Sequence, residues 1–143
     1  EYTYDEKGNI ILYEYKQENN ENIGTGLLSE KSRLQNEDAF TKAYLKAVKY
    51  TPDIPFDTAD TDFFSTVHWH FQLVLDYGEH TDNTVAEDVS WPMRQDPHST
   101  FRSGFEIRTY RLCHRFLMFH HFEAELGSSP YLVKSTEITY DEN

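Results

Sequence analysis

The chain has 143 residues, 38% of them hydrophobic and 15% aromatic, and a formal net charge of −12. A chain of this size and composition can bury one hydrophobic core, so it is neither disordered nor fibrous, and we expect a single domain over residues 1–143. The negative charge repels phosphate backbones and argues against nucleic-acid binding, and no apolar run approaches the roughly 20 residues that cross a bilayer, so we expect no membrane insertion by this segment.

The first third of the chain predicts a hairpin, a loop and a strand. Gly8 and Asn9 tolerate positive φ and form a turn signal before residues 10–17, which are rich in aliphatic and aromatic side chains. Residues 18–37 are mostly polar and predict a loop, with a short helical turn as an alternative. A strand is expected over residues 44–50, ending at the prolines that follow, because proline removes a backbone donor.

Residues 68–77 carry the clearest alternating pattern in the chain. One face holds large apolar side chains, and the other mixes histidines with polar residues and one valine, so we expect a strand buried on the first face and solvated on the second. The first face consists of Trp69, Phe71, Leu73, Leu75 and Tyr77. The acidic stretch 79–88 that follows has almost no apolar content and predicts a solvated loop.

Residues 105–122 fit two interpretations. As a strand, the apolar pattern changes phase near Thr109, which a bulge or turn would explain. As a helix, Leu112, Phe116 and Phe119 form one stripe. Residues 132–140, which follow a Gly-Ser-Ser-Pro signal, predict a final strand. With the high aromatic content, these elements indicate a mainly β fold: an antiparallel sheet or a β-sandwich-like domain with long loops and at most short helical turns.

Two groups of residues resemble parts of known sites. His68 and His70 would point the same way from a strand and could form half of a zinc site, but no third or fourth ligand is evident, so we interpret them as surface residues. Glu123-Ala-Glu125 has the Glu-x-Glu form of mono-ADP-ribosyltransferases, and His98-Ser99-Thr100 only partly matches the Ser-Thr-Ser strand of those enzymes. Cys113 is interpreted as a core residue. We therefore assign no catalytic, metal-binding or cofactor-binding residue and expect no cofactor.

A long, specific match covers residues 91–122, which read WPMRQDPHSTFRSGFEIRTYRLCHRFLMFHHF. This run resembles the SpvB-type region that opens the B components of insecticidal toxin complexes and a Salmonella plasmid virulence protein. Tyr44-Leu45-Lys46, Asp76-Tyr77-Gly78-Glu79-His80 and Leu132-Val133-Lys134-Ser135-Thr136 follow the same order as in that family. The resemblance favours the strand interpretation of residues 105–122.

The resemblance implies a non-catalytic structural module of a secreted bacterial virulence or toxin-complex protein. Such a module is one segment of a β-rich shell that encloses or presents a C-terminal toxin, and its partners are the other domains of the same polypeptide and the toxin-complex subunits. Since the chain also lacks an initiating Met, we expect a piece of a much larger polypeptide whose enzymatic region lies elsewhere. The alternatives are a stand-alone β-rich domain that recognises a protein or glycan surface and, less favoured, an ADP-ribosyltransferase.

The arginines of this run predict a structural ion-pair network. Residues 91–122 hold five of the six arginines but only two acidic residues, a net charge of +3, so the remainder of the chain carries −15. Arginine is the cation best suited to bidentate pairing with carboxylates. Under the resemblance, we expect a ladder of buried or interfacial pairs formed by Arg102, Glu106, Arg108, Arg111, Arg115, Asp76, Glu79 and Asp96.

Overall fold

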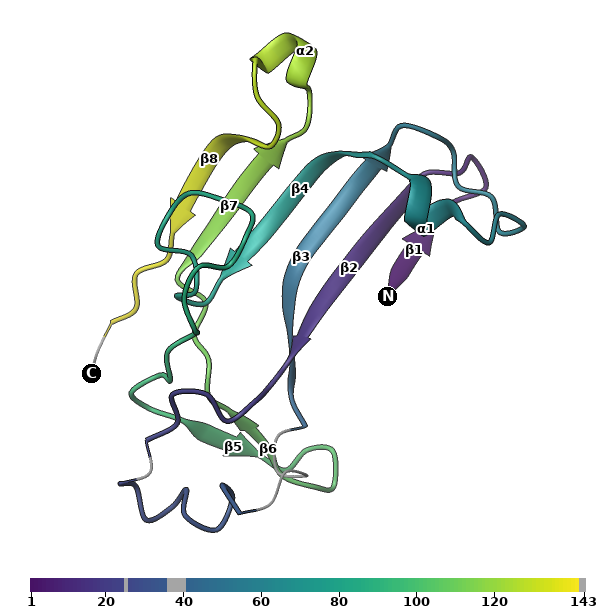
Figure 1. Cartoon of the computed structure of the whole chain (residues 1–143). Helices are drawn as coiled ribbons and strands as arrows, with labels where there is room; N and C mark the ends of the chain where they lie inside the picture. Colours follow the sequence, from purple (N-terminus) through teal and green to yellow (C-terminus); the bar gives the residue numbers. More distant parts are fainter. Residues whose placement is uncertain (25, 36–40, 142–143) are drawn as a thin grey trace.

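The computed structural model describes residues 1–24, 26–35 and 41–141. Figure 1 shows a curved six-stranded sheet in the order β1-β2-β3-β4-β7-β8, with a two-stranded sheet, β5-β6, beyond one end of it. Every strand pairing is antiparallel. The elements are β1 (Tyr2–Tyr4), β2 (Ile10–Gln17), β3 (Ala43–Pro52), α1 (Phe63–Thr66), β4 (Trp69–Asp76), β5 (His98–Thr100), β6 (Ile107–Thr109), β7 (Arg115–His120), α2 (Glu123–Leu126) and β8 (Tyr131–Glu137).

The prediction of a mainly β fold is confirmed, in its form of an antiparallel sheet with long loops and short helical turns. Both helices in the described part of the chain have four residues, so neither is long enough to cross a membrane. The hairpin is confirmed as well, since β1 and β2 pair across a turn in which the Asp5 carboxylate accepts hydrogen bonds from two backbone N–H groups. Gly8 has a φ of 80° there.

The strand predicted over residues 68–77 forms, but the prediction of its buried face was wrong. Gln72, Val74 and Asp76 are buried, whereas the side chains of the apolar face, such as Phe71 and Leu73, are only half-buried. The segment of residues 77–97 covers the face that carries Val74, so this face is sealed despite its polar residues (Figure 1). The alternation of apolar and polar residues predicts that a strand forms, but it does not show which face of that strand the rest of the chain covers.

The phase change near Thr109 marks a break between two strands of different sheets. Strand β6 ends at Thr109 and pairs with β5, and β7 begins at Arg115 between β4 and β8. The five residues between them follow an irregular path. The strand interpretation is therefore confirmed. The helical interpretation of the stripe from Leu112 to Phe119 was wrong, because Leu112 lies in the irregular segment and Phe116 and Phe119 lie in strand β7.

Two apolar clusters form the core between the sheet and its loops. Val74, Leu117 and Phe119 form one cluster, against which Val85 and Leu132 pack. The other consists of three aromatic side chains, whose rings meet edge to face with centroids 5.5 to 6.4 Å apart: Tyr44, Tyr77 and Trp91. Each cluster thus joins the sheet to the segment of residues 77–97.

Candidate functional site

Arg111 lies at the centre of the most deeply buried ion pair of the described chain. Its side chain is fully buried, and its Nε donates to both carboxylate oxygens of Glu18 at 3.0 and 3.1 Å. Its two terminal nitrogens donate to the carbonyl oxygens of Trp91 and Glu21, both at 2.9 Å. The carboxylate and two carbonyls therefore replace the water that the guanidinium loses on burial.

Trp91 completes this centre by packing between two cations. The Arg111 guanidinium lies 4.4 Å from the indole centroid and the Lys16 ammonium lies 4.2 Å from it. The indole N–H donates to the Asn19 side chain at 2.9 Å. Since Trp91 is fully buried and Lys16 and Asn19 lie at and just beyond the end of β2, the indole holds the 77–97 segment against that part of the chain.

A second cluster surrounds the buried carboxylate of Glu30. Arg108 forms an ion pair with Glu30, and the Tyr110 hydroxyl donates to its other carboxylate oxygen. Burial raises the pKa of Glu30, but the hydrogen bonds from Tyr110 and Arg108 outweigh it and hold the pKa below its ordinary value. Nearby, the Glu106 carboxylate bridges Arg33 and the Ser99 hydroxyl.

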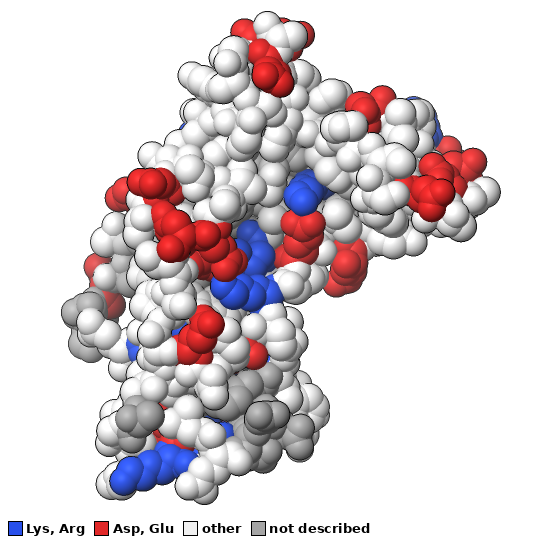
Figure 2. Space-filling view, in the orientation of Figure 1, with Lys and Arg blue, Asp and Glu red and all other residues white. Residues whose placement is uncertain are grey.

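A third cluster lies where β4 ends. The Arg115 guanidinium pairs with Asp76 at 2.7 Å, and the Lys46 ammonium contacts both Glu79 and the His80 ring. Burial raises the pKa of Asp76, but the hydrogen bond from the backbone N–H of residue 78 and the Arg115 guanidinium lower it by more. The pKa of Asp76 therefore lies below its ordinary value. Figure 2 shows basic and acidic side chains lying against one another over the middle of the visible face.

The residues predicted for the ladder fall into separate clusters and not into one run. Asp76 pairs with Arg115, and Asp96 pairs with Arg94 near the surface. Glu106 and Glu79 instead take cations from outside the arginine-rich run, Arg33 and Lys46. Arg102 is exposed in the turn between β5 and β6, and no ion pair to it is found among the described residues.

The acidic partners of Arg108 and Arg111 were missed by the sequence analysis. Glu30 and Glu18 both lie in residues 18–37, which were predicted to be a loop, and both are buried. The charge imbalance indicated that such acids exist but not which ones they are. Glu79 was also placed in a solvated loop, whereas its side chain is fully buried.

Asp76, Glu79 and His80 form the one group of three potential metal ligands found among the described residues, with ligand atoms within 4.8 Å of one another. The Lys46 ammonium already contacts Glu79, lies 3.2 Å from the His80 ring and donates to the Leu75 carbonyl at 3.0 Å. It therefore supplies positive charge where a metal ion would bind. This arrangement favours a structural ion-pair cluster.

The other candidates from the sequence lie apart from these clusters. The His68 side chain is 84% exposed and lies 3.3 Å from an Asp53 carboxylate oxygen, while the His70 ring stacks on Phe122. Glu123 and Glu125 lie on the exposed helix α2, and Figure 1 shows that β5, which holds Ser99, lies at the opposite end of the molecule. The Glu-x-Glu residues and the segment that partly matches the Ser-Thr-Ser strand are therefore not brought together.

Cys113 is half-buried beside the aromatic cluster that contains Tyr77, in agreement with its interpretation as a core residue. Burial raises the pKa of the Cys113 thiol above its ordinary value, so little thiolate forms near neutral pH.

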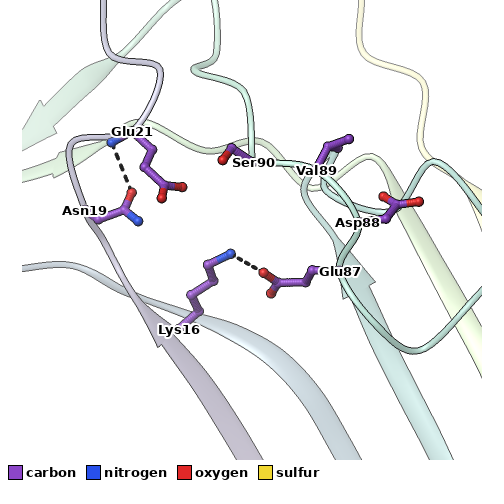
Figure 3. Close-up of a pocket in the computed structure, with 7 residues that line it drawn as sticks. All are labelled: Lys16, Asn19, Glu21, Glu87, Asp88, Val89 and Ser90. Carbon is purple, nitrogen blue, oxygen red and sulfur yellow. Dashed lines mark hydrogen bonds and ion pairs between the residues drawn. The ribbon is translucent and has the colours of Figure 1, made fainter.

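Two surface cavities border the arginine-rich region. One, of about 470 Å³, lies between the end of β2 and residues 87–90, and Figure 3 shows Lys16 reaching across it to Glu87. The other, of about 770 Å³, is lined by residues 92–96 together with Leu112, His114, Tyr140 and Asp141. The buried guanidinium of Arg111 lines neither cavity.

The comparisons with known proteins agree with this fold. The family model described as "Salmonella virulence plasmid 65kDa B protein" matches residues 1–122. The chain belongs to the SpvB family. A mono(ADP-ribosyl)transferase SpvB of Salmonella typhimurium is 39% identical over 95% of this SpvB-family chain, but the match spans only 23% of the relative's length.

Two solved structures extend the comparison. The N-terminal domain of the effector protein SpvB from Salmonella typhimurium superposes with a TM-score of 0.81 at 36% identity, covering all of this chain and 45% of that domain. The TcdB2-TccC3 structure superposes with a TM-score of 0.79 at 30% identity, covering all of this chain and 7% of that protein. The chain therefore matches part of the N-terminal domain of SpvB and a small part of a much longer toxin-complex protein.

Proposed function

We propose that this chain is a non-catalytic structural module of a secreted bacterial virulence or toxin-complex protein, one segment of the β-rich shell that encloses or presents a C-terminal toxin. The part of the relatives that it matches supports this proposal. The chain spans 23% of the length of the curated relatives, and its match to SpvB lies in the N-terminal domain. On this proposal, the ADP-ribosylating activity in the relative's name belongs to a region outside the match.

The observation that carries the proposal is that three arginines of the run, Arg108, Arg111 and Arg115, form ion pairs with carboxylates of the chain itself. Arg111 is fully buried against Glu18 and two backbone carbonyls, and Arg108 and Arg115 are held by Glu30 and Asp76. An NAD-binding cleft needs cations that can contact the dinucleotide phosphates. These guanidinium groups are committed to carboxylates of the chain itself, which is what a scaffold requires.

An enzymatic role is tested by NAD hydrolysis. The chain and its Glu123→Gln/Glu125→Gln variant are incubated with NAD, and released nicotinamide is measured. We expect no turnover above buffer for either protein, because both glutamates lie on the exposed four-residue helix α2 with no buried residue beside them. Turnover by the chain that disappears in the variant would contradict the non-catalytic assignment.

The structural role is tested on the polypeptide encoded by the complete reading frame. After limited proteolysis under native conditions, we expect the SpvB-family segment to co-elute with the remaining fragments in size-exclusion chromatography, because a shell segment stays packed against its neighbours. Release of the segment as a free folded fragment that binds a protein or glycan would instead favour the stand-alone recognition domain.

A further inference from the structure

One face of the six-stranded sheet is covered by little of this chain. Cross-strand registers define its rows: Ile11, Tyr50 and Phe71 lie directly opposite one another on β2, β3 and β4, and Tyr13, Val48, Leu73 and Met118 form the next row. Side chains in register on neighbouring strands lie on the same face of a sheet. We call this set, together with Phe116 and with His120 opposite Phe71, the open face: Ile11, Tyr13, Val48, Tyr50, Phe71, Leu73, Phe116, Met118 and His120.

Burial alternates along β4 and β7 and distinguishes the open face from the covered face there. On β7, Leu117 and Phe119 are fully buried, whereas Phe116 and Met118 are only half-buried. None of the open-face side chains is among the buried core residues, and Ile11 is 37% exposed. The contacts found within the open face run sideways, such as the stacked rings of Tyr50 and Phe71 with centroids 5.1 Å apart.

The composition of the open face is unlike that of a solvent-facing sheet surface. Eight of its nine side chains are aliphatic, aromatic or methionine and the ninth is the His120 imidazole, in a chain of which 27% is charged. A sheet with one solvated face normally alternates apolar and polar residues. Here the charged side chains Asp76 and Arg115 lie on the covered face, where they pair with each other. A contiguous apolar surface across four strands is typical of a face that another layer of protein covers.

We propose that the open face packs against the polypeptide corresponding to the rest of the SpvB N-terminal domain, which contributes an apolar layer over β2, β3, β4 and β7. This chain covers only 45% of that domain, so more than half of it lies outside the match and is covalently linked to the matched part. A covalently linked segment is present at a high effective concentration, so it binds the open face in preference to a separate protein of similar affinity. Because the open face is largely apolar, the layer that covers it is expected to be apolar as well. The inference rests on the proposed structural role and specifies the surface through which the module joins its neighbour.

The test compares cysteine labelling in the 143-residue chain with labelling in the polypeptide from the complete reading frame. Leu73→Cys and Met118→Cys place thiols on the open face, and Glu6→Cys, in the exposed turn after β1, is the control. Maleimide labelling rates are measured for each site by peptide mass spectrometry, so that native Cys113 is followed separately. Circular dichroism verifies that each variant keeps its β spectrum, and two independent open-face positions guard against the failure of one variant to fold.

We expect both open-face thiols to label at least about tenfold more slowly in the complete polypeptide than in the 143-residue chain, as buried sites require local opening to react. The Glu6→Cys thiol should label equally in both. Equal rates at the open-face sites would overturn the proposal. Slow, concentration-dependent labelling of the 143-residue chain with a dimer mass would overturn it in favour of a second copy, and so would a reading frame that lacks the additional segment.

The labelling experiment and the proteolysis experiment can fail independently of each other. If the open-face thiols label freely while the proteolysed segment still co-elutes with its neighbours, the structural role stands and this interface is wrong. If the segment is released as an independent fragment, the structural role itself fails.

Discussion

Replacing Arg111 with methionine removes the cation of the most buried pair while keeping a side chain of similar length. The Glu18 side chain, 1% exposed, then remains in the interior without its cation and keeps only hydrogen-bond donors such as the Asn19 backbone N–H. Breaking a buried pair from one side costs about 3–5 kcal/mol, since the remaining charge is uncompensated. With roughly 2–8 °C of Tm per kcal/mol for domains near this size, the expected fall in Tm is on the order of 10–20 °C.

The assay is thermal unfolding for the Tm and urea unfolding for the free energy, both followed by circular dichroism and by tryptophan fluorescence. Trp69 and Trp91 both contribute to that fluorescence, and the Trp91 ring lies 4.4 Å from the Arg111 guanidinium. Arg102→Met removes the same charge from an exposed position and should change the unfolding free energy by less than about 0.5 kcal/mol. The double variant Arg111→Met/Glu18→Met should recover much of the loss, because no charge is then left buried. A cost for Arg111→Met within about 0.5 kcal/mol of that for Arg102→Met would refute the reasoning.

The remaining predictions concern the loss of stability at low pH and the effect of replacing two glycines with alanine. Folding lowers the pKa values of Glu30 and Asp76. Their contribution to stability is therefore complete above the ordinary carboxyl pKa values and is lost as the pH falls through the lowered values. We expect the urea midpoint to drop between about pH 5 and pH 2. Asp76→Asn should flatten that decline, and an unchanged slope would contradict it. Gly78, with φ +98°, lies where an added Cβ would be 2.8 Å from Pro92, whereas Gly104, with φ +83°, has open space. Gly78→Ala should therefore lower the Tm by more than Gly104→Ala, and equal shifts would show that only backbone strain matters.

The strands could be predicted from the sequence because alternation is a local property of the chain. Residues 10–17 and 69–76 form strands within a residue or two of their predicted bounds. The turn at Gly8 was also predictable, since its φ of 80° suits glycine. The break after Thr109 was visible as a change of phase, but the assignment of β6 and β7 to different sheets was not, because pairing partners lie far away in sequence.

The buried face and the ionic partners could not be predicted for the same reason. The face of β4 that carries Val74 is buried because residues 77–97 return over it, and no pattern within β4 records that path. Glu18 is 93 residues from Arg111, and Glu30 is 78 residues from Arg108. Their segment is mostly polar, so no local pattern distinguishes either carboxylate from its exposed neighbours until the fold brings an arginine to it.

The two faces of the sheet therefore have different roles in specifying the structure. Next to the sheet, just beyond the end of β2, a buried acid such as Glu18 is tolerated only where it meets its arginine, because an unpaired buried charge costs several kcal/mol. The polar segment 18–35 and the 77–97 segment are thus restricted to arrangements that satisfy Arg111, Arg108 and Arg115 together. The open face carries no such restriction, since apolar side chains pack against many partners of suitable shape. We infer that the charged network fixes the conformation of the module itself, whereas the apolar face is left for association with the next part of the polypeptide.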